Sequence, residues 1–276
     1  MPAQKNSTGG EPVQSSRDGP VTLVRIQRPE AANAVDPTTA RALYRAMLDF
    51  EADDGASVAV LAGTPTRFCA GFDLKSLADG AADEWLEQLH FGETGEPPLG
   101  PMGPTRLRLG KPVIAAIAGP AVAGGMELAL WCDLRVMERS AWMGVLCRRW
   151  GVPLIDGGTV RLPRLVGQGR ALDLVMTGRR IEADECLQIG LCERVVEPGN
   201  AVSAAVELAR SLAALPQDCL RSDRDALRYG AMPDEMAALQ AEFHAGRQVL
   251  DEARKGARRF AEGAGRHGAR ADWTSD

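Results

Sequence analysis

Two glycine-containing segments of the sequence could act together on one oxygen atom. They are Phe68–Lys75 (FCAGFDLK) and Ala118–Leu128 (AGPAVAGGMEL). Glycine lets the backbone approach a ligand closely, and a helix N-terminus offers free N–H groups with a partial positive charge. Because each segment follows an apolar run typical of a strand, both should lie where open α/β sheets bind ligands. Two N–H groups could thus stabilise charge on one oxygen, although each segment alone is equally consistent with an ordinary tight turn.

The strands that must position these turns are short and apolar. Val21–Arg28 alternates apolar and polar residues, as a half-buried strand does, whereas the other runs are typical of buried parallel strands. We expect strands at Val21–Arg28, Ser57–Ala62, Pro112–Ile117, Leu134–Val136 and Trp142–Val145. Strands that alternate with helices predict an α/β core.

Helices are expected between and after these strands. Asp36-Pro37 predicts a helix start, because Asp is a good N-cap and Pro suits the first turn, and this helix should end near Asp54. Residues 76–110 contain several Gly and Pro and are expected to be an irregular binding loop. Further helical patterns cover Gly158–Thr177, Ala183–Ile189, Ala201–Leu215 and nearly all of the chain from Pro216 to about Glu262.

Composition narrows the class of protein. The 276 residues carry a net charge of −5, so neither nucleic acid nor an anionic membrane is expected as a partner. The polar first 18 residues contain no secretory signal and are predicted to be a disordered tail. The six cysteines form no CxxC pair, which indicates reduced, mostly buried thiols and a cytoplasmic location.

The two glycine segments belong to an ordered series of motifs that resembles the crotonase (enoyl-CoA hydratase/isomerase) superfamily. Each motif is weak alone, but their order and spacing hold over about residues 20–200. The other members of the series are Arg28–Ala34 (RPEAANA), Gly151-Val152-Pro153 with Gly157-Gly158-Thr159, Arg161–Gly167 (RLPRLVG), Ala171–Gly178 (ALDLVMTG) and Ala183–Gly190 (ADECLQIG) with Val195-Val196.

The resemblance implies an α/β fold, a crotonase-like spiral of ββα units over residues 19–200. A C-terminal helical trimerisation region would cover 201–264, with a frayed tail at 265–276. It also implies an acyl-CoA thioester as substrate, with coenzyme A as part of the substrate rather than a cofactor. No metal and no redox cofactor are expected, and the assembly would be a homotrimer or a dimer of trimers.

Carried over by position, the resemblance assigns an oxyanion hole to the N–H groups of Phe72 and Gly124. Such donors stabilise the enolate-like charge that a thioester carbonyl gains during reaction, and loss of one typically costs about 3–4 kcal/mol. The resemblance places Arg28, Ala70 and Lys75 with the bound coenzyme A. Arg28 and Lys75 could equally be ordinary surface cations.

The acidic groups depart from the hydratase pattern. Glu127, three residues after Gly124, matches the first catalytic glutamate, although a glutamate near a helix start can also be an electrostatic cap. The second glutamate position holds Cys147, which would line the substrate site but is a poor proton donor near neutral pH. Asp156 resembles the aspartates of dienoyl-CoA isomerases and 4-chlorobenzoyl-CoA dehalogenases. It could instead form an Asx-type turn or cap the helix beginning at Gly157 or Gly158.

These residues support three functions. The first is an enoyl-CoA hydratase that adds water to a 2-enoyl-CoA with Glu127 as the acid/base. The second is an enoyl- or dienoyl-CoA isomerase in which Glu127 and Asp156 share the proton transfers. The third is a crotonase homologue that binds CoA esters without turnover.

Overall fold

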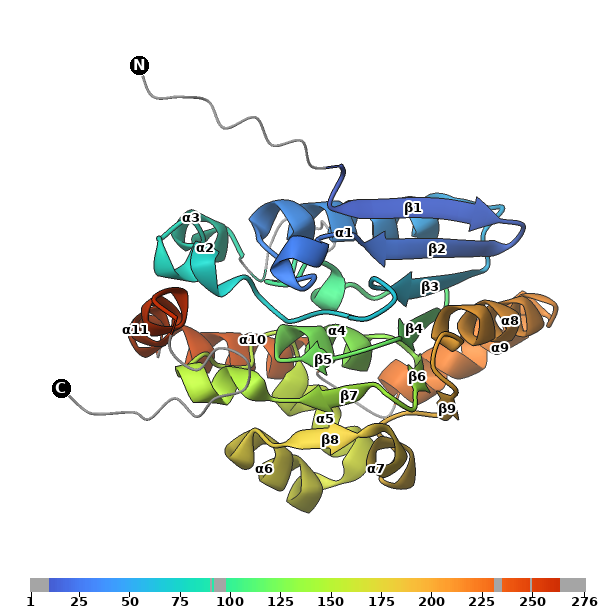
Figure 1. Ribbon diagram of the computed structural model, residues 1–276. Coiled ribbons are helices and arrows are strands. Elements are labelled where there is room, and N and C mark those ends of the chain that lie inside the picture. Colours follow the sequence, from blue (N-terminus) through green and yellow to red (C-terminus); the bar gives the residue numbers. More distant parts are fainter. Residues whose placement is uncertain (1–9, 90, 92–97, 231–234, 249, 264–276) are drawn as a thin grey trace.

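A six-stranded sheet forms the centre of the protein (Figure 1). The structure is a computed structural model, and it describes residues 10–89, 91, 98–230, 235–248 and 250–263. The strand order is β1-β2-β3-β4-β6-β9, and every pair is parallel except β1–β2. These strands are β1 (Val13–Asp18), β2 (Val21–Ile26), β3 (Val58–Ala62), β4 (Val113–Ile117), β6 (Leu134–Glu138) and β9 (Arg194–Val196).

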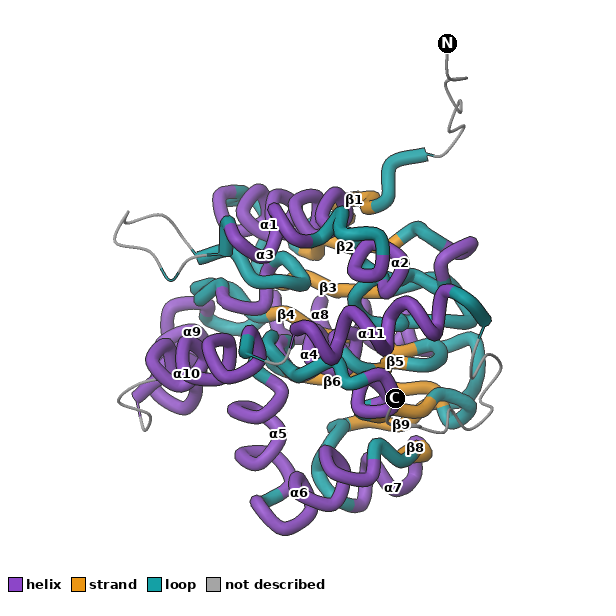
Figure 2. Tube along the Cα trace, turned by 90° about the vertical axis from the view of Figure 1, so that its left-hand side faces the viewer, coloured by secondary structure: helices purple, strands orange, loops and turns teal. Residues whose placement is uncertain are grey.

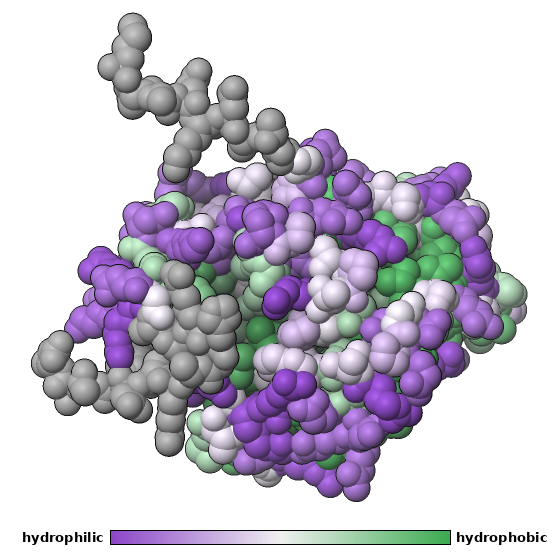
Figure 3. All heavy atoms as spheres, viewed as in Figure 1, coloured by the Kyte–Doolittle hydropathy of each residue, from purple (hydrophilic) through white to green (hydrophobic). Residues whose placement is uncertain are grey.

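Helices cover both faces of this sheet, which explains its continuous apolar strands. All five residues of β3 are buried. Because side chains alternate along a strand, Val58 and Val60 face α8 (Ala201–Ala213), whereas Ala59 and Leu61 join the larger core that includes α1 (Pro37–Ala52). Most of the surface in Figure 3 is hydrophilic, and hydrophobic residues gather on the right, beside α8.

A second, smaller sheet carries the turns of interest. Its strands are β5 (Ala121–Val122), β7 (Trp142–Gly144) and β8 (Arg180–Glu182). Two isolated parallel bridges continue the same pattern, Val35 with Phe72 and Cys69 with Ala121. Successive segments of the chain therefore stack on one another, which is the spiral of ββα units that the resemblance implied. The predicted fold class is confirmed.

Most predicted helices are present. Asp36 caps α1 as expected, because its side chain accepts a hydrogen bond from the Thr39 amide at 2.8 Å. The other helices are α2 (Leu74–Ala78), α3 (Asp83–Glu87), α4 (Gly124–Trp131), α5 (Gly158–Val166), α6 (Gln168–Thr177), α7 (Ala183–Gln188), α9 (Gln217–Asp225), α10 (Glu235–Arg247) and α11 (Leu250–Ala261). Short 3-10 segments occur at η1 (Pro29–Ala31), η2 (Pro104–Arg106) and η3 (Leu146–Trp150), and a π-helical turn, η4, spans Ala226–Gly230.

Three structural expectations are wrong in part. Residues 13–18 form β1 rather than part of a disordered tail, because their backbone pairs with β2 while the side chains after Val13 stay exposed. Residues 76–110, which were expected to be irregular, contain the helix α3 and the 3-10 segment η2. The helical pattern at 158–177 is two helices, since Gly167 has φ +80°. The division at residue 200 stays a prediction, and α8 packs on the central sheet and shares its core. The expected tail at 265–276 lies outside the described residues.

The last helices fold back over the core of their own chain. Figures 1 and 2 place α11 below α2, and α11 packs on both α2 and η3. The backbones of α11 and η3 are in close contact, because a Cβ added to Gly256 would lie 1.8 Å from the Trp150 carbonyl oxygen. No helix in the described part of the chain is both long and apolar enough to cross a bilayer.

Asn33 fixes the loop between β2 and α1. It is fully buried with φ 58°, a conformation that Asn tolerates better than most residues. Its Oδ1 accepts a hydrogen bond from the Arg28 amide, and its Nδ2 donates to Thr64 and to the carbonyls of Arg67 and Phe68, over 2.9–3.3 Å. One side chain thus joins this loop to the start of the first glycine segment.

We predict that Asn33→Ala lowers the free energy of unfolding by about 2–4 kcal/mol, because it leaves several buried polar groups without partners. Urea denaturation measures this. The control is Asn200→Ala, at an exposed asparagine, which should change stability by less than about 0.5 kcal/mol. Equal effects of the two substitutions would contradict the assignment.

Candidate active site

The two glycine segments lie against each other. Val122 donates a backbone hydrogen bond to the Cys69 carbonyl at 3.0 Å, next to the Cys69–Ala121 bridge. A Cβ added to Gly71 would lie 3.0 Å from the Gly124 amide nitrogen. The two turns therefore come into close contact at Gly71 and Gly124.

Each of the two turns contains a residue with an unusual backbone conformation. Gly71 has φ +92°, and Ala123 has φ 53° and ψ −127°, an unusual conformation for a residue with a Cβ. Such strain typically costs about 1–3 kcal/mol and persists where the surroundings impose it. Within the described part of the chain, neither the Phe72 amide nor the Gly124 amide donates a hydrogen bond. Both amides are thus available to a ligand.

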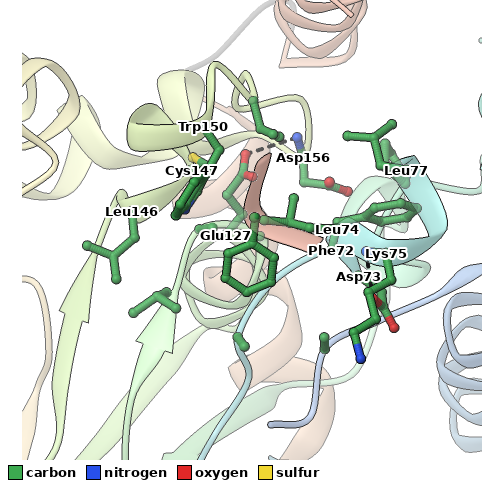
Figure 4. A pocket seen from close by; sticks show the side chains of 18 of the residues that line it. Phe72, Asp73, Leu74, Lys75, Leu77, Glu127, Leu146, Cys147, Trp150 and Asp156 are labelled. Atoms are coloured by element: carbon green, nitrogen blue, oxygen red, sulfur yellow. Dashed lines mark hydrogen bonds between the residues drawn. The ribbon is translucent and has the colours of Figure 1, made fainter. Parts of the chain in front are cut away.

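A cavity of about 720 Å³ opens beside these amides. Phe72 and Gly124 line it, together with apolar side chains from η3, the loop before α5, and α11 (Figure 4). Leu77, Leu86 and Pro101 also line it, so the expected contribution of residues 76–110 to the pocket is present. The size and apolar lining are typical of a small-molecule site.

Glu127 is the acidic group nearest the second turn. It lies in the first turn of α4 and is 3% exposed. Its Oε1 accepts hydrogen bonds from the amides of Asp156 (2.9 Å) and Gly158 (2.8 Å). Burial raises the Glu127 pKa well above its ordinary value, and the nearby carboxylates of Asp156 and Glu242 raise it further. Glu127 is therefore buried at the cavity, and its neutral form is favoured more than in an ordinary exposed glutamate.

Asp156 lines the same cavity as Phe72, and Figure 4 shows its backbone joined to Glu127. Its Oδ1 accepts hydrogen bonds from the Met102 amide at 2.9 Å and from the Thr105 hydroxyl. The interpretation as an N-cap is wrong, because Gly157 caps α5 and no side chain caps it there. Burial raises the pKa of Asp156, opposed by Thr105, Met102 and two arginines.

Cys147 lines the cavity from η3, at the position expected for a second glutamate. Burial raises the pKa of its thiol to about 12, and an ionised Glu127 would raise it further. The thiol therefore stays neutral at physiological pH, and it cannot supply the missing carboxylate.

The residues predicted to bind coenzyme A differ in whether their side chains already pair with other residues of the chain. Arg28 lines the cavity, but its guanidinium already binds Asp36 and Asp73, each at 3.1 Å, and the Ala34 carbonyl. It therefore braces the segment after Phe72, which a simple surface cation would not do. Lys75 is exposed at the rim, and Ala70 lines the cavity, so both lie where an extended anionic ligand could reach them.

Sequence reasoning missed several buried polar residues behind the cavity. Glu242, on α10, accepts hydrogen bonds from the Gly157 and Thr159 amides. Arg106 is 2% exposed and stacks on Phe91 and Phe243, and burial lowers its pKa to about 10. Neither residue belongs to a recognisable motif, because each acts through a contact between segments far apart in the sequence.

The fold and its cavity are those of a crotonase-type lyase or isomerase. The chain matches the enoyl-CoA hydratase/isomerase family over residues 16–267. The chain belongs to this family.

Individual relatives agree with this assignment. The chain is 34% identical to enoyl-CoA hydratase EchA19 of Mycobacterium tuberculosis, covering 89% of this chain and 92% of the relative. It is 39% identical to a carnitinyl-CoA dehydratase of Salmonella arizonae, covering 73% and 74%. A solved carnitinyl-CoA hydratase from Mycobacterium avium superposes with a TM-score of 0.83 at 28% identity, covering 97% of this chain and all of the other.

We predict that Gly71→Ala lowers turnover at least tenfold more than Gly124→Ala does. A Cβ at Gly71 would meet Ala123 Cβ at 2.9 Å and the Gly124 amide, at a positive φ, so it must displace the amide pair. A Cβ at Gly124 would meet the flexible side chain of Met102. Steady-state kinetics on an acyl-CoA substrate measure both variants, with Gly169→Ala, in open space on α6, as the inert control. A larger loss for Gly124→Ala would contradict the geometry.

We predict that the stability difference between Glu127→Gln and the parent chain widens as pH rises. The folded chain holds Glu127 protonated to a higher pH than the unfolded chain does. The parent's free energy of unfolding therefore falls as pH rises from the ordinary glutamate pKa through the raised one. Gln stays neutral and can still accept both amide bonds. Melting temperatures of both chains between about pH 4 and pH 9 measure this, and a constant difference would show that Glu127 is not held neutral.

Proposed function

We propose that the protein is an enoyl-CoA hydratase that adds water reversibly across the double bond of a 2-enoyl-CoA. The observation that carries this proposal is Glu127, a buried carboxyl group with a raised pKa on the same cavity as Phe72 and Gly124. Its Oε1 is held by two N–H donors, so the acidic proton belongs on Oε2. The named relatives include hydratases and dehydratases of CoA thioesters, which supports the same reaction class.

One carboxyl group can complete this reaction. The thioester oxygen would sit between the Phe72 and Gly124 amides, which stabilise the charge that develops there. Glu127 would give its proton to C2 while a water oxygen bonds to C3, and the water's released proton would return to the carboxylate. The net change is the addition of one water molecule. Glu127 ends as it began, so the same neutral group serves the reverse elimination.

Coenzyme A would enter past Lys75 and Ala70, with the acyl group directed toward Trp150, Ile155 and α11. Lys75 is exposed and could pair with a phosphate, whereas the charge of Arg28 is already matched by carboxylates. The apolar lining beyond Glu127 favours a hydrophobic acyl group.

Isomerisation is the second candidate, and the position of Asp156 favours it. Asp156 and Glu127 line one cavity, so a double-bond shift could pass a proton between two carbons through two acids. Asp156→Asn separates the reactions: a hydratase that relies on Glu127 retains hydration, whereas a paired isomerase loses turnover on 3-enoyl- and dienoyl-CoA.

The predicted homotrimer or dimer of trimers, the cytoplasmic location and the absence of a redox cofactor stay predictions. Light scattering on the purified chain gives the oligomeric state directly.

We predict that purified protein consumes the 2-enoyl chromophore of crotonyl-CoA. Glu127→Gln should lower kcat at least about 10²-fold, because proton transfer by a positioned side chain contributes about 10²–10⁴-fold. Cys147→Ser should retain activity within about fivefold, since the thiol is neutral and takes no part. Formation of the chromophore from a 3-enoyl-CoA, without hydration, would establish the isomerase instead. Binding of CoA esters without turnover on any substrate would refute both.

A further inference from the structure

One face of α10 lies along the segment that binds Glu127. Glu235, Leu239, Glu242 and Gly246 are spaced by four, three and four residues, so they share one side of the helix. Glu235 pairs with Arg161 at 3.2 Å. A Cβ at Gly157 would lie 2.9 Å from Leu239, and a Cβ at Gly246 would lie 2.1 Å from Ile155. The helix therefore backs residues 155–161 at close range.

The amides at the start of α5 are divided between two glutamates. The Asp156 and Gly158 amides donate to Glu127, at 2.9 and 2.8 Å. The Gly157 and Thr159 amides donate to Glu242, at 2.6 and 2.8 Å, and the Thr159 hydroxyl donates to the same carboxyl group at 2.6 Å. Alternate amides of residues 156–159 thus bind a glutamate on α4 and a glutamate on α10.

We propose that Glu242 is a positioning residue for Glu127, holding residues 156–159 from behind so that their remaining amides fix the Glu127 carboxyl group at the cavity. This inference rests on the proposed role of Glu127 in proton transfer. Glu242 does not line the cavity, so it acts through the shared backbone and through its charge.

The charges around this segment come from several elements. The acidic groups are Glu127 on α4, Glu235 and Glu242 on α10, and Asp156 just before α5. The other titratable groups are Arg161 in α5, Arg106 in η2 and Cys147 in η3. The carboxylate of Glu242 is among the groups that raise the Glu127 pKa. Removal of that carboxylate should therefore lower the pKa of Glu127, because a like charge disfavours ionisation.

The test is the pH profile of kcat/KM for Glu242→Gln. Gln keeps the shape but presents an NH₂ group to one of the donor amides and carries no charge. We expect kcat to fall about tenfold or more with KM changed less than about threefold, because the acid is misplaced while the cavity is intact. We also expect one limb of the profile to move to lower pH by about 0.5 unit or more.

Two further variants make the result specific. Glu235→Gln is the matched control: it removes the carboxylate that pairs with Arg161 on the same helix face but leaves the Gly157 and Thr159 amides paired. It should reduce stability without moving the limb. Glu242→Asp keeps the charge and should keep the limb near its original pH. An unshifted profile in Glu242→Gln, or the same shift in Glu235→Gln, would overturn the proposal.

A measurement without turnover separates this inference from the proposed function. A double-mutant cycle of Glu127→Gln and Glu242→Gln, followed by urea unfolding at pH 6 and pH 9, gives the coupling between the two side chains. Coupling that changes with pH supports the linkage even if crotonyl-CoA is not a substrate. Additive effects at both pH values would refute the linkage even if the chain is an active hydratase.

Discussion

The start of α5 is the point on which the site depends. A carboxyl group buried in apolar surroundings is costly unless polar groups surround it, and the backbone amides of residues 156–159 provide them for both Glu127 and Glu242. Those amides would otherwise lack partners at a helix N-terminus. One short segment thereby stabilises two acids and leaves Glu127 facing the cavity, with its pKa raised rather than lowered.

The stacking of successive chain segments explains why the two glycine turns lie side by side. The bridges of Val35 with Phe72 and of Cys69 with Ala121 place one turn beside the other, although about 50 residues separate them. Asn33 and Arg28 then fix the first turn from the upstream loop, through carbonyl and carboxylate partners. This support allows the strained conformation at Ala123 to persist, because many contacts around it would be lost if it relaxed.

Features that depend on neighbouring residues could be predicted from the sequence, whereas contacts between distant segments could not. The Asp36 cap, the buried strand at Val58–Ala62 and the two glycine turns depend on neighbouring residues, so their types and spacing predicted them. β1 was missed because five of its six side chains are exposed, and its order comes from pairing with β2. Glu242 was missed because its partners lie more than 80 residues away, and nothing in the sequence of α10 distinguishes it from a solvated acid.

The neutral thiol of Cys147 has a consequence for the lifetime of the enzyme. A 2-enoyl thioester is an electrophile, and a thiolate beside it would add to C3 and block the cavity. With the Cys147 pKa near 12, only about one thiol in 10⁵ is ionised at pH 7, since each pH unit below the pKa lowers that fraction tenfold. Burial of Cys147, which lies near Glu127 in Figure 4, thus disfavours the thiolate that the proposed substrate would alkylate.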